Sequence, residues 1–159
     1  MDGVSFGQSK AMERYIARKC GLFGSTDEES ALIDCIGEHV RDIKEKWGKI
    51  RMMGGMGAPP TPEKEAAIKK WFDNELAEWL VKLEKSLPLN GANNHAVGSS
   101  LSYADVCIWN LLHETFDASQ QESVSKSLEA CERLRAIAET VASNKNLQDW
   151  LAARPVTMF

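Results

Sequence analysis

The stretch that decides the fold is Leu101-Ser102-Tyr103-Ala104-Asp105-Val106-Cys107-Ile108-Trp109. Ser102 is suited to be the N-cap of a helix, because its hydroxyl can accept a hydrogen bond from the backbone N–H of Asp105. Asp105 can accept in turn from the Ser102 N–H, which completes a capping box. The residues that follow are nearly all apolar as far as Leu112. A helix that is apolar on most faces belongs in the middle of a helical bundle, so we expect Ser102 and Asp105 to begin a buried central helix.

Helical periodicity also accounts for the rest of the chain. Apolar residues recur at three- and four-residue steps, and they predict further helices over 10–20, 25–52, 61–87, 128–141 and 144–151. The Gly- and Pro-rich run at 53–60 must be a loop, and residues 89–100 form a connector rich in Asn and Gly. No alternating run predicts a strand. We therefore predict an all-α protein, a bundle of about seven helices.

Composition and charge exclude several classes of protein. The chain has 159 residues, of which 43% are hydrophobic and 26% charged, as expected for one globular domain. Its net charge is −4, and no run of Lys and Arg exceeds two residues, which argues against a nucleic-acid partner. No apolar run is long enough to span a membrane, and the start of the chain lacks a signal-peptide pattern. We expect no membrane insertion and a cytoplasmic location.

The four cysteines are Cys20, Cys35, Cys107 and Cys131. Their spacing matches neither a metal-binding CxxC pair nor a disulfide framework, so we expect no metal site. They lie in apolar helical patterns, which favours buried thiols in a reducing compartment. Cys35 and His39 are four residues apart and could form a nucleophile–base pair or half of a metal site, but a structural role is favoured because no third ligand is evident.

Three segments, taken in order, carry a family resemblance. They are 8–24, which opens with Gln-Ser, 101–105, which holds the capping box, and 147–155, which reads LQDWLAARP. In this order they resemble the cytosolic glutathione S-transferase family of the sigma, mu and pi kind. The first segment resembles the last helix of that family's N-terminal thioredoxin-like domain. The resemblance implies that residues 1–24 are a remnant of that domain and that residues 25–159 are the C-terminal helical domain.

The resemblance leaves the activity of this chain open. A full member of the family carries a βαβ unit before the Gln-Ser helix, and that unit holds the catalytic Tyr or Ser. Only seven residues precede Gln8, and neither Tyr15 nor Tyr103 is placed like the catalytic tyrosine, so we expect no catalytic residue here. The intact enzyme would conjugate glutathione to electrophiles, with this chain inactive alone. The alternative is a non-catalytic scaffold or a subunit of a larger assembly, because one apolar flank of the first helix would be exposed.

Glutathione is the substrate that the resemblance implies. Gln8 and Ser9 would hold its γ-glutamyl end, at a helix N-terminus whose free N–H groups suit a carboxylate. Asp42 matches the acid that reaches across the dimer interface of these enzymes to the glutathione amino group. The alternatives are a plain N-cap for Gln8 and Ser9, and for Asp42 a solvated charge paired with Lys46 one turn later.

The second helix ends in Trp47, Gly48 and Met52, beside the Met- and Gly-rich loop. In the resembled family this part of the helix borders the pocket for the hydrophobic co-substrate, and methionine gives such a surface adaptability. The same surface could instead dock another protein or a missing domain. We also expect a homodimer, formed through residues 31–50 and 65–87.

Overall fold

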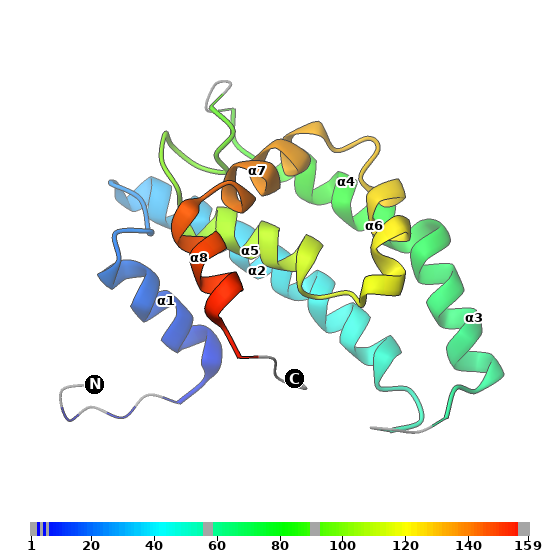
Figure 1. The fold of residues 1–159 in the computed structure, drawn as a ribbon. Coiled ribbons are helices and arrows are strands. Elements are labelled where there is room, and N and C mark those ends of the chain that lie inside the picture. Colours follow the sequence, from blue (N-terminus) through cyan, green and yellow to red (C-terminus); the bar gives the residue numbers. More distant parts are fainter. Residues whose placement is uncertain (1–2, 4, 6, 56–58, 90–92, 156–159) are drawn as a thin grey trace.

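The computed structural model describes residues 3, 5, 7–55, 59–89 and 93–155. Within these ranges every regular element is helical and none is a strand, so the all-α prediction is confirmed (Figure 1). In chain order the elements are α1 (Ser9–Lys19), α2 (Asp27–Arg51), α3 (Pro62–Lys70), η1 (Trp71–Glu75), α4 (Leu76–Ser86), α5 (Tyr103–His113), η2 (Ala118–Gln120), α6 (Gln121–Ser127), α7 (Glu132–Ala142) and α8 (Lys145–Ala153). None of the helices in the described residues combines the length and apolar character that a membrane crossing requires.

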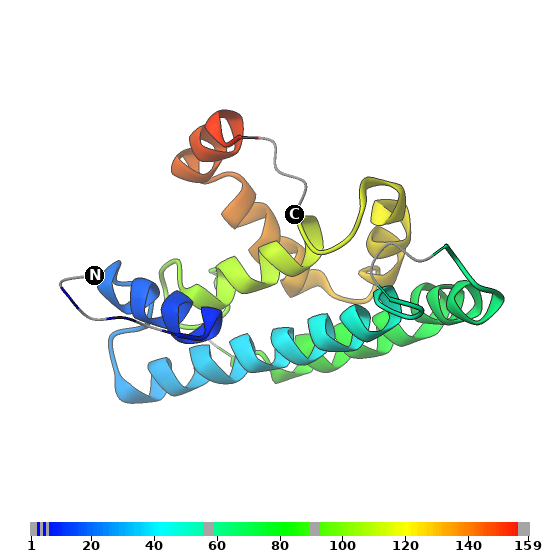
Figure 2. The same ribbon diagram turned by 90° about the horizontal axis from the view of Figure 1, so that it is seen from below.

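The predicted central helix is α5, which packs against α2 on one side and α7 on the other (Figures 1 and 2). Both halves of the capping box are present, with Ser102 as the N-cap and Asp105 at the third helical position. Ile108 and Leu111 have no exposed surface. The prediction of a capped, buried central helix is therefore confirmed.

Asp105 does more than close the capping box. Its carboxylate has no exposed surface and accepts from the backbone N–H of Ser102 at 2.7 Å and of Ala96 at 2.7 Å. The ring nitrogen Nδ1 of His95 lies 3.7 Å from the same carboxylate. The reciprocal bond, from the Asp105 N–H to the Ser102 hydroxyl, is long at 3.5 Å. The carboxylate is therefore the main part of the cap, and it also ties the preceding connector to α5.

The predicted helix at 61–87 is present, but it contains a π-helical turn. Thr61 caps α3, and α3, η1 and α4 follow one another without a break. A regular α period in the sequence favours an apolar stripe of Ile68, Phe72, Leu76, Trp79, Leu83 and Leu87, whereas the buried positions are Trp71, Leu76, Leu80, Leu83 and Leu87. The five-residue step from Trp71 to Leu76 suits the i→i+5 bonding of a π turn. The extra residue keeps Trp71 on the core side, and a sequence stripe with a regular α period misses it.

The region between α5 and α7 differs from the prediction. The polar run that begins at Asp117 contains a short turn, η2, and leads into a further helix, α6. The helix expected over 128–141 begins later, at Glu132. The reason lies on another element. The Glu84 carboxylate of α4 accepts from the backbone N–H groups of Arg133 and Leu134, each at 2.9 Å. It therefore caps α7 from a distant part of the chain.

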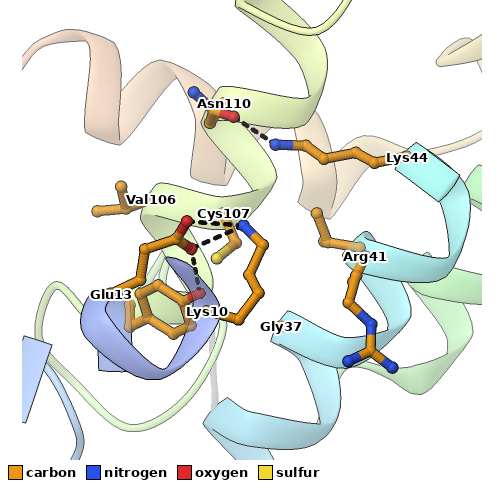
Figure 3. A pocket seen from close by; sticks show the side chains of 10 residues that line it. Lys10, Glu13, Gly37, Arg41, Lys44, Val106, Cys107 and Asn110 are labelled. Carbon is orange, nitrogen blue, oxygen red and sulfur yellow. Dashed lines mark hydrogen bonds and ion pairs between the residues drawn. The ribbon is translucent and has the colours of Figure 1, made fainter. Parts of the chain in front are cut away.

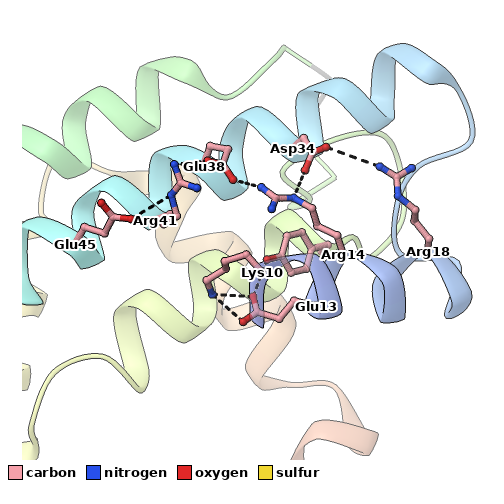
Figure 4. A network of polar contacts seen from close by, with 9 residues as sticks. Lys10, Glu13, Arg14, Arg18, Asp34, Glu38, Arg41 and Glu45 are labelled. Carbon is pink, nitrogen blue, oxygen red and sulfur yellow. Dashed lines mark hydrogen bonds and ion pairs between the residues drawn. The ribbon is translucent and has the colours of Figure 1, made fainter. Parts of the chain in front are cut away.

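Polar contacts hold α1 against the rest of the molecule (Figure 4). Arg14 pairs with Asp34, at 2.6 Å, and with Glu38, both on α2. The Tyr103 hydroxyl donates to Glu13 at 2.8 Å. The apolar periodicity that predicts this helix includes Met12 and Ile16, but within α1 only Ala17 is buried, whereas Met12 and Ile16 are 40% and 47% exposed. An apolar flank of α1 therefore faces outward.

Candidate functional site

Gln8 stands immediately before α1 in a strained backbone conformation. Its φ is +68° and its ψ is 109°, in a region that residues other than glycine rarely adopt. Such a conformation costs on the order of 1–3 kcal/mol and is typical of ligand-binding positions. Gln8 and Ser9 are both exposed, and no side chain caps the helix. The first N–H groups of α1 are therefore available to an anion.

Asp42 lies in a different place from Gln8 and Ser9. It is exposed on α2, in a shallow groove whose other lining residues are Arg14, Asp34, Cys35, Glu38, His39 and Trp79. Among the described residues no ion pair joins Asp42 to Lys46. Neither Gln8 nor Ser9 lines this groove. Within one chain, the structure does not bring the three predicted glutathione-binding residues together.

Cys35 and His39 share that groove. His39 lies edge-on to Trp79 with ring centroids 6.1 Å apart, and its Nδ1 is 3.4 Å from the Ser86 hydroxyl. Burial lowers the pKa of His39, although the charge of Asp42 opposes the shift. Cys35 itself is exposed.

The expectation of buried thiols is confirmed only in part. Cys131 is buried and Cys107 is half-buried, whereas Cys20 and Cys35 are exposed. Cys20 is the C-cap of α1, a helix in which only Ala17 is buried, and Cys35 is not among the buried residues of α2.

The three residues predicted to border a co-substrate pocket have different surroundings. Trp47 is only 3% exposed and packs against Trp71, Phe72 and Phe116, with ring centroids 5.3 to 6.0 Å apart. Gly48 is half-buried, with open space where a Cβ atom would stand, and Met52 is 44% exposed. Trp47 therefore belongs to the aromatic core, while Gly48 and Met52 offer surface. The pocket itself stays a prediction.

A cavity that the sequence did not indicate lies between α1, α2 and α5 (Figure 3). Its volume is about 210 Å³. Its lining residues are Lys10, Glu13, Gly37, Val40, Arg41, Lys44, Tyr103, Val106, Cys107 and Asn110. Periodicity could not reveal this cavity, because it is assembled from the sides of three separate helices.

Tyr103 on this cavity is not a free phenol. Its hydroxyl donates to Glu13, and its ring approaches Gly37 so closely that an added Cβ there would lie 3.2 Å from it. Burial raises the pKa of Tyr103. The side chain therefore joins α1, α2 and α5, and its hydroxyl is already engaged.

Comparison with known proteins identifies the family. Residues 42–154 match the family model described as "Glutathione S-transferase, C-terminal domain". The whole chain is 30% identical, over 162 aligned residues, to "Glutathione S-transferase 3" of Caenorhabditis elegans and spans 73% of its length. This chain belongs to the glutathione S-transferase family, and the helices within residues 42–154 are those of the family's C-terminal domain.

Solved structures agree in fold. The glutathione S-transferase of Ascaris lumbricoides superposes with a TM-score of 0.75 at 27% identity, covering 100% of this chain and 74% of that one. A Necator americanus transferase, described as monomeric, superposes with a TM-score of 0.77 at 23% identity over 100% of this chain and 74% of its own. The second likeness is evidence for the fold alone.

Proposed function

We propose that this chain is the helical part of a glutathione-conjugating enzyme and that Gln8 and Ser9 hold the γ-glutamyl end of glutathione. The observation that carries the proposal is the strained backbone of Gln8 at an uncapped helix N-terminus. A plain N-cap would not need positive φ, and its side chain would bond to the helix. The helix dipole and the free N–H groups favour a carboxylate there.

Residues 1–24 are, on this proposal, the end of a thioredoxin-like domain, and residues 25–159 are the helical domain. The thiol-activating hydroxyl is supplied from outside this chain. Gly48 and Met52, at the end of α2 beside Trp47, border the electrophile. The four free cysteines of the chain suit a cytoplasmic location, where thiols stay reduced.

A homodimer completes the glutathione site on this proposal. Asp42 lies on the outer face of α2, in the groove that Trp79 of α4 also lines. Two copies packed through α2 and the α3–α4 helix would present Asp42 to the glutathione amino group in the partner, a carboxylate facing an ammonium. Light scattering coupled to size-exclusion chromatography should give twice the chain mass, and a monomer at micromolar concentration would count against the dimer.

Glutathione binding is the direct test of the Gln8–Ser9 site. We expect calorimetry to detect glutathione binding to the chain and Ser9→Ala to weaken it about tenfold. Gln8→Val should also weaken binding, because positive φ is strongly unfavourable for a β-branched residue. Gln8→Gly should weaken it less, because glycine adopts positive φ readily and only the side chain is lost. Ser100→Ala, at an exposed serine, is the matched control. Equal binding by Ser9→Ala and wild type would overturn the assignment.

The purified chain should show little or no conjugation of glutathione to a chromogenic electrophile. Turnover at rates typical of enzymes would mean that the chain itself activates the glutathione thiol. The proposal that the activating hydroxyl is supplied from outside the chain would then be wrong.

A scaffold or subunit role is the second candidate, and the outward apolar side chains Met12, Ile16 and Leu32 favour it. The gene sequence upstream of Met1 discriminates between the two. An in-frame βαβ segment with a tyrosine supports the enzyme, and a stop codon supports the scaffold.

A further inference from the structure

The cavity between α1, α2 and α5 combines an apolar wall with a buried positive charge. Val40 of α2 and Val106 and Cys107 of α5 supply apolar surface, and the Tyr103 ring closes one side. The Lys44 side chain reaches across from α2 toward α5 (Figure 3). A small organic molecule could therefore contact apolar groups and a cation together.

Lys44 is the unusual member of this set. Its ammonium group is partly buried, and its hydrogen-bond acceptor among the described residues is the Asn110 side-chain oxygen, a neutral group. Burial lowers the pKa of Lys44 and the nearby charge of Lys10 lowers it further, whereas the charge of Glu13 opposes the shift. A partly buried ammonium whose hydrogen-bond acceptor is neutral is less stable than one bonded to an anion, and an anion in the cavity would supply that bond.

The other charged groups of the cavity are already matched. Glu13 accepts from Lys10, at 2.8 Å to each of its oxygens, and from the Tyr103 hydroxyl at 2.8 Å. The Arg41 guanidinium turns away from Lys44 and pairs with Glu38 at 2.6 Å and with Glu45 at 3.4 Å (Figures 3 and 4). The Lys10 ammonium beside Glu13 offsets the repulsion between the Glu13 carboxylate and an anion bound at Lys44.

We propose that this cavity binds a small organic anion, with the acidic group on Lys44 Nζ and the apolar body against Val40, Val106 and Cys107. The ligand class is a compact aromatic or aliphatic carboxylate that the cavity of about 210 Å³ can hold. This site is separate from the proposed glutathione residues, since neither Gln8 nor Ser9 lines the cavity.

Benzoate is a suitable probe, and benzamide is its neutral counterpart of the same shape. Calorimetry or ligand-observed NMR should show that benzoate binds and that benzamide binds more weakly. Lys44→Met keeps the length of the side chain and removes the charge, so it should weaken benzoate binding about tenfold. Lys46→Met, on the same helix at an exposed position outside the cavity, should leave binding unchanged.

The cysteines give a second measurement that needs no variant. Cys107 lines the cavity, whereas Cys20 and Cys35 are exposed elsewhere. Benzoate should slow alkylation of Cys107, followed by peptide mass spectrometry, and should leave the rates at the two exposed cysteines unchanged. This measurement stands even if Lys44→Met fails to fold.

Several results would overturn the proposal. These are the absence of benzoate binding, equal affinity for benzamide, unaltered affinity in folded Lys44→Met, and no protection of Cys107. Displacement of benzoate by glutathione would make the cavity part of the glutathione site and end the claim of a separate one. Failure of glutathione to bind at all would contradict the proposed function and leave this test intact.

Discussion

At the scale of single residues, Asp105 and Lys44 show two ways of burying an ionisable group. The Asp105 carboxyl group has three backbone or hydroxyl donors around it, from Ser102 and Ala96. Lys44 has one neutral acceptor. A fully satisfied buried group stabilises a fold, whereas a partly satisfied one costs stability and is more typical of a binding site.

Asp105→Ala should therefore be strongly destabilising. The change leaves the N–H groups of Ser102 and Ala96 buried without acceptors and removes a charged N-cap partner, and we expect a loss of about 3 kcal/mol in the free energy of unfolding. Urea unfolding followed by far-UV circular dichroism measures it. Asp149→Ala, which removes an exposed ion pair with Lys145, should change the free energy by less than about 0.5 kcal/mol. Similar stabilities for the two variants would contradict the stabilising role of the buried Asp105 carboxylate.

At the scale of elements, the π turn η1 is a one-residue insertion in an otherwise regular helix. Trp71, its first residue, and Leu76, which follows it, both face the core and have no exposed surface. Removing one residue from the turn would convert their five-residue step to four, which an α-helix places on one face. The two halves of the helix would then keep their orientation to the core.

Deletion of Asn74, which is exposed within η1, should accordingly be tolerated. We expect cooperative thermal unfolding with a Tm close to that of wild type. Deletion of Lys82, an exposed residue of α4 outside the π turn, should abolish cooperative unfolding because it rotates Leu83 and Leu87 off the core face. Calorimetry distinguishes the two, and an equally damaging Asn74 deletion would show that η1 is needed for more than register.

The cap that Glu84 provides to α7 is a second feature of this scale. Glu84→Gln keeps the shape but offers one neutral acceptor to two N–H groups, so we expect a loss of about 2 kcal/mol in the free energy of unfolding. Glu78→Gln, at an exposed position of the same helix, is the control and should have almost no effect. Urea denaturation gives both values. No difference between the variants would mean that the cap contributes little.

At the scale of the whole molecule, α1 is attached to the bundle largely through polar groups. Glu13 is the centre of its contact with α5. Burial alone would raise the pKa of Glu13, but hydrogen bonds from Lys10 and Tyr103 and the charges of Lys10 and Lys44 outweigh it and hold the pKa below its ordinary value of 4.5. The ionised carboxylate is therefore favoured in the folded state.

The attachment of α1 should weaken in acid. A lowered pKa contributes stability that is present above about pH 4.5 and is lost as the pH falls through the lowered value. We expect wild type to exceed Glu13→Gln by about 1 kcal/mol at about pH 6, a modest value because solvent screens this partly exposed group, and the difference should shrink as the pH falls below about 4.5. Urea unfolding at both pH values tests this. Exposed Glu129→Gln should match wild type throughout, and a difference for Glu13→Gln that did not change with pH would contradict the linkage.

The sequence by itself determined the all-helical class, most of the helices and the start of the central one. Ser102 with Asp105, and Thr61 with Pro62, mark helix starts through contacts within a single turn, so neighbouring residues suffice to predict them. The family resemblance was readable for the same reason, because its motifs are local.

Only the tertiary structure decided how separate helices meet. The cap of Glu84 on α7, the cavity around Lys44 and the burial of Trp71 each depend on groups far apart in the chain. The positive φ of Gln8 also lay beyond prediction, because residues other than glycine seldom adopt it. Sequence periodicity reports which side of a helix is apolar, whereas the helix packing decides which side is covered, and for Met12 and Ile16 of α1 the two differ.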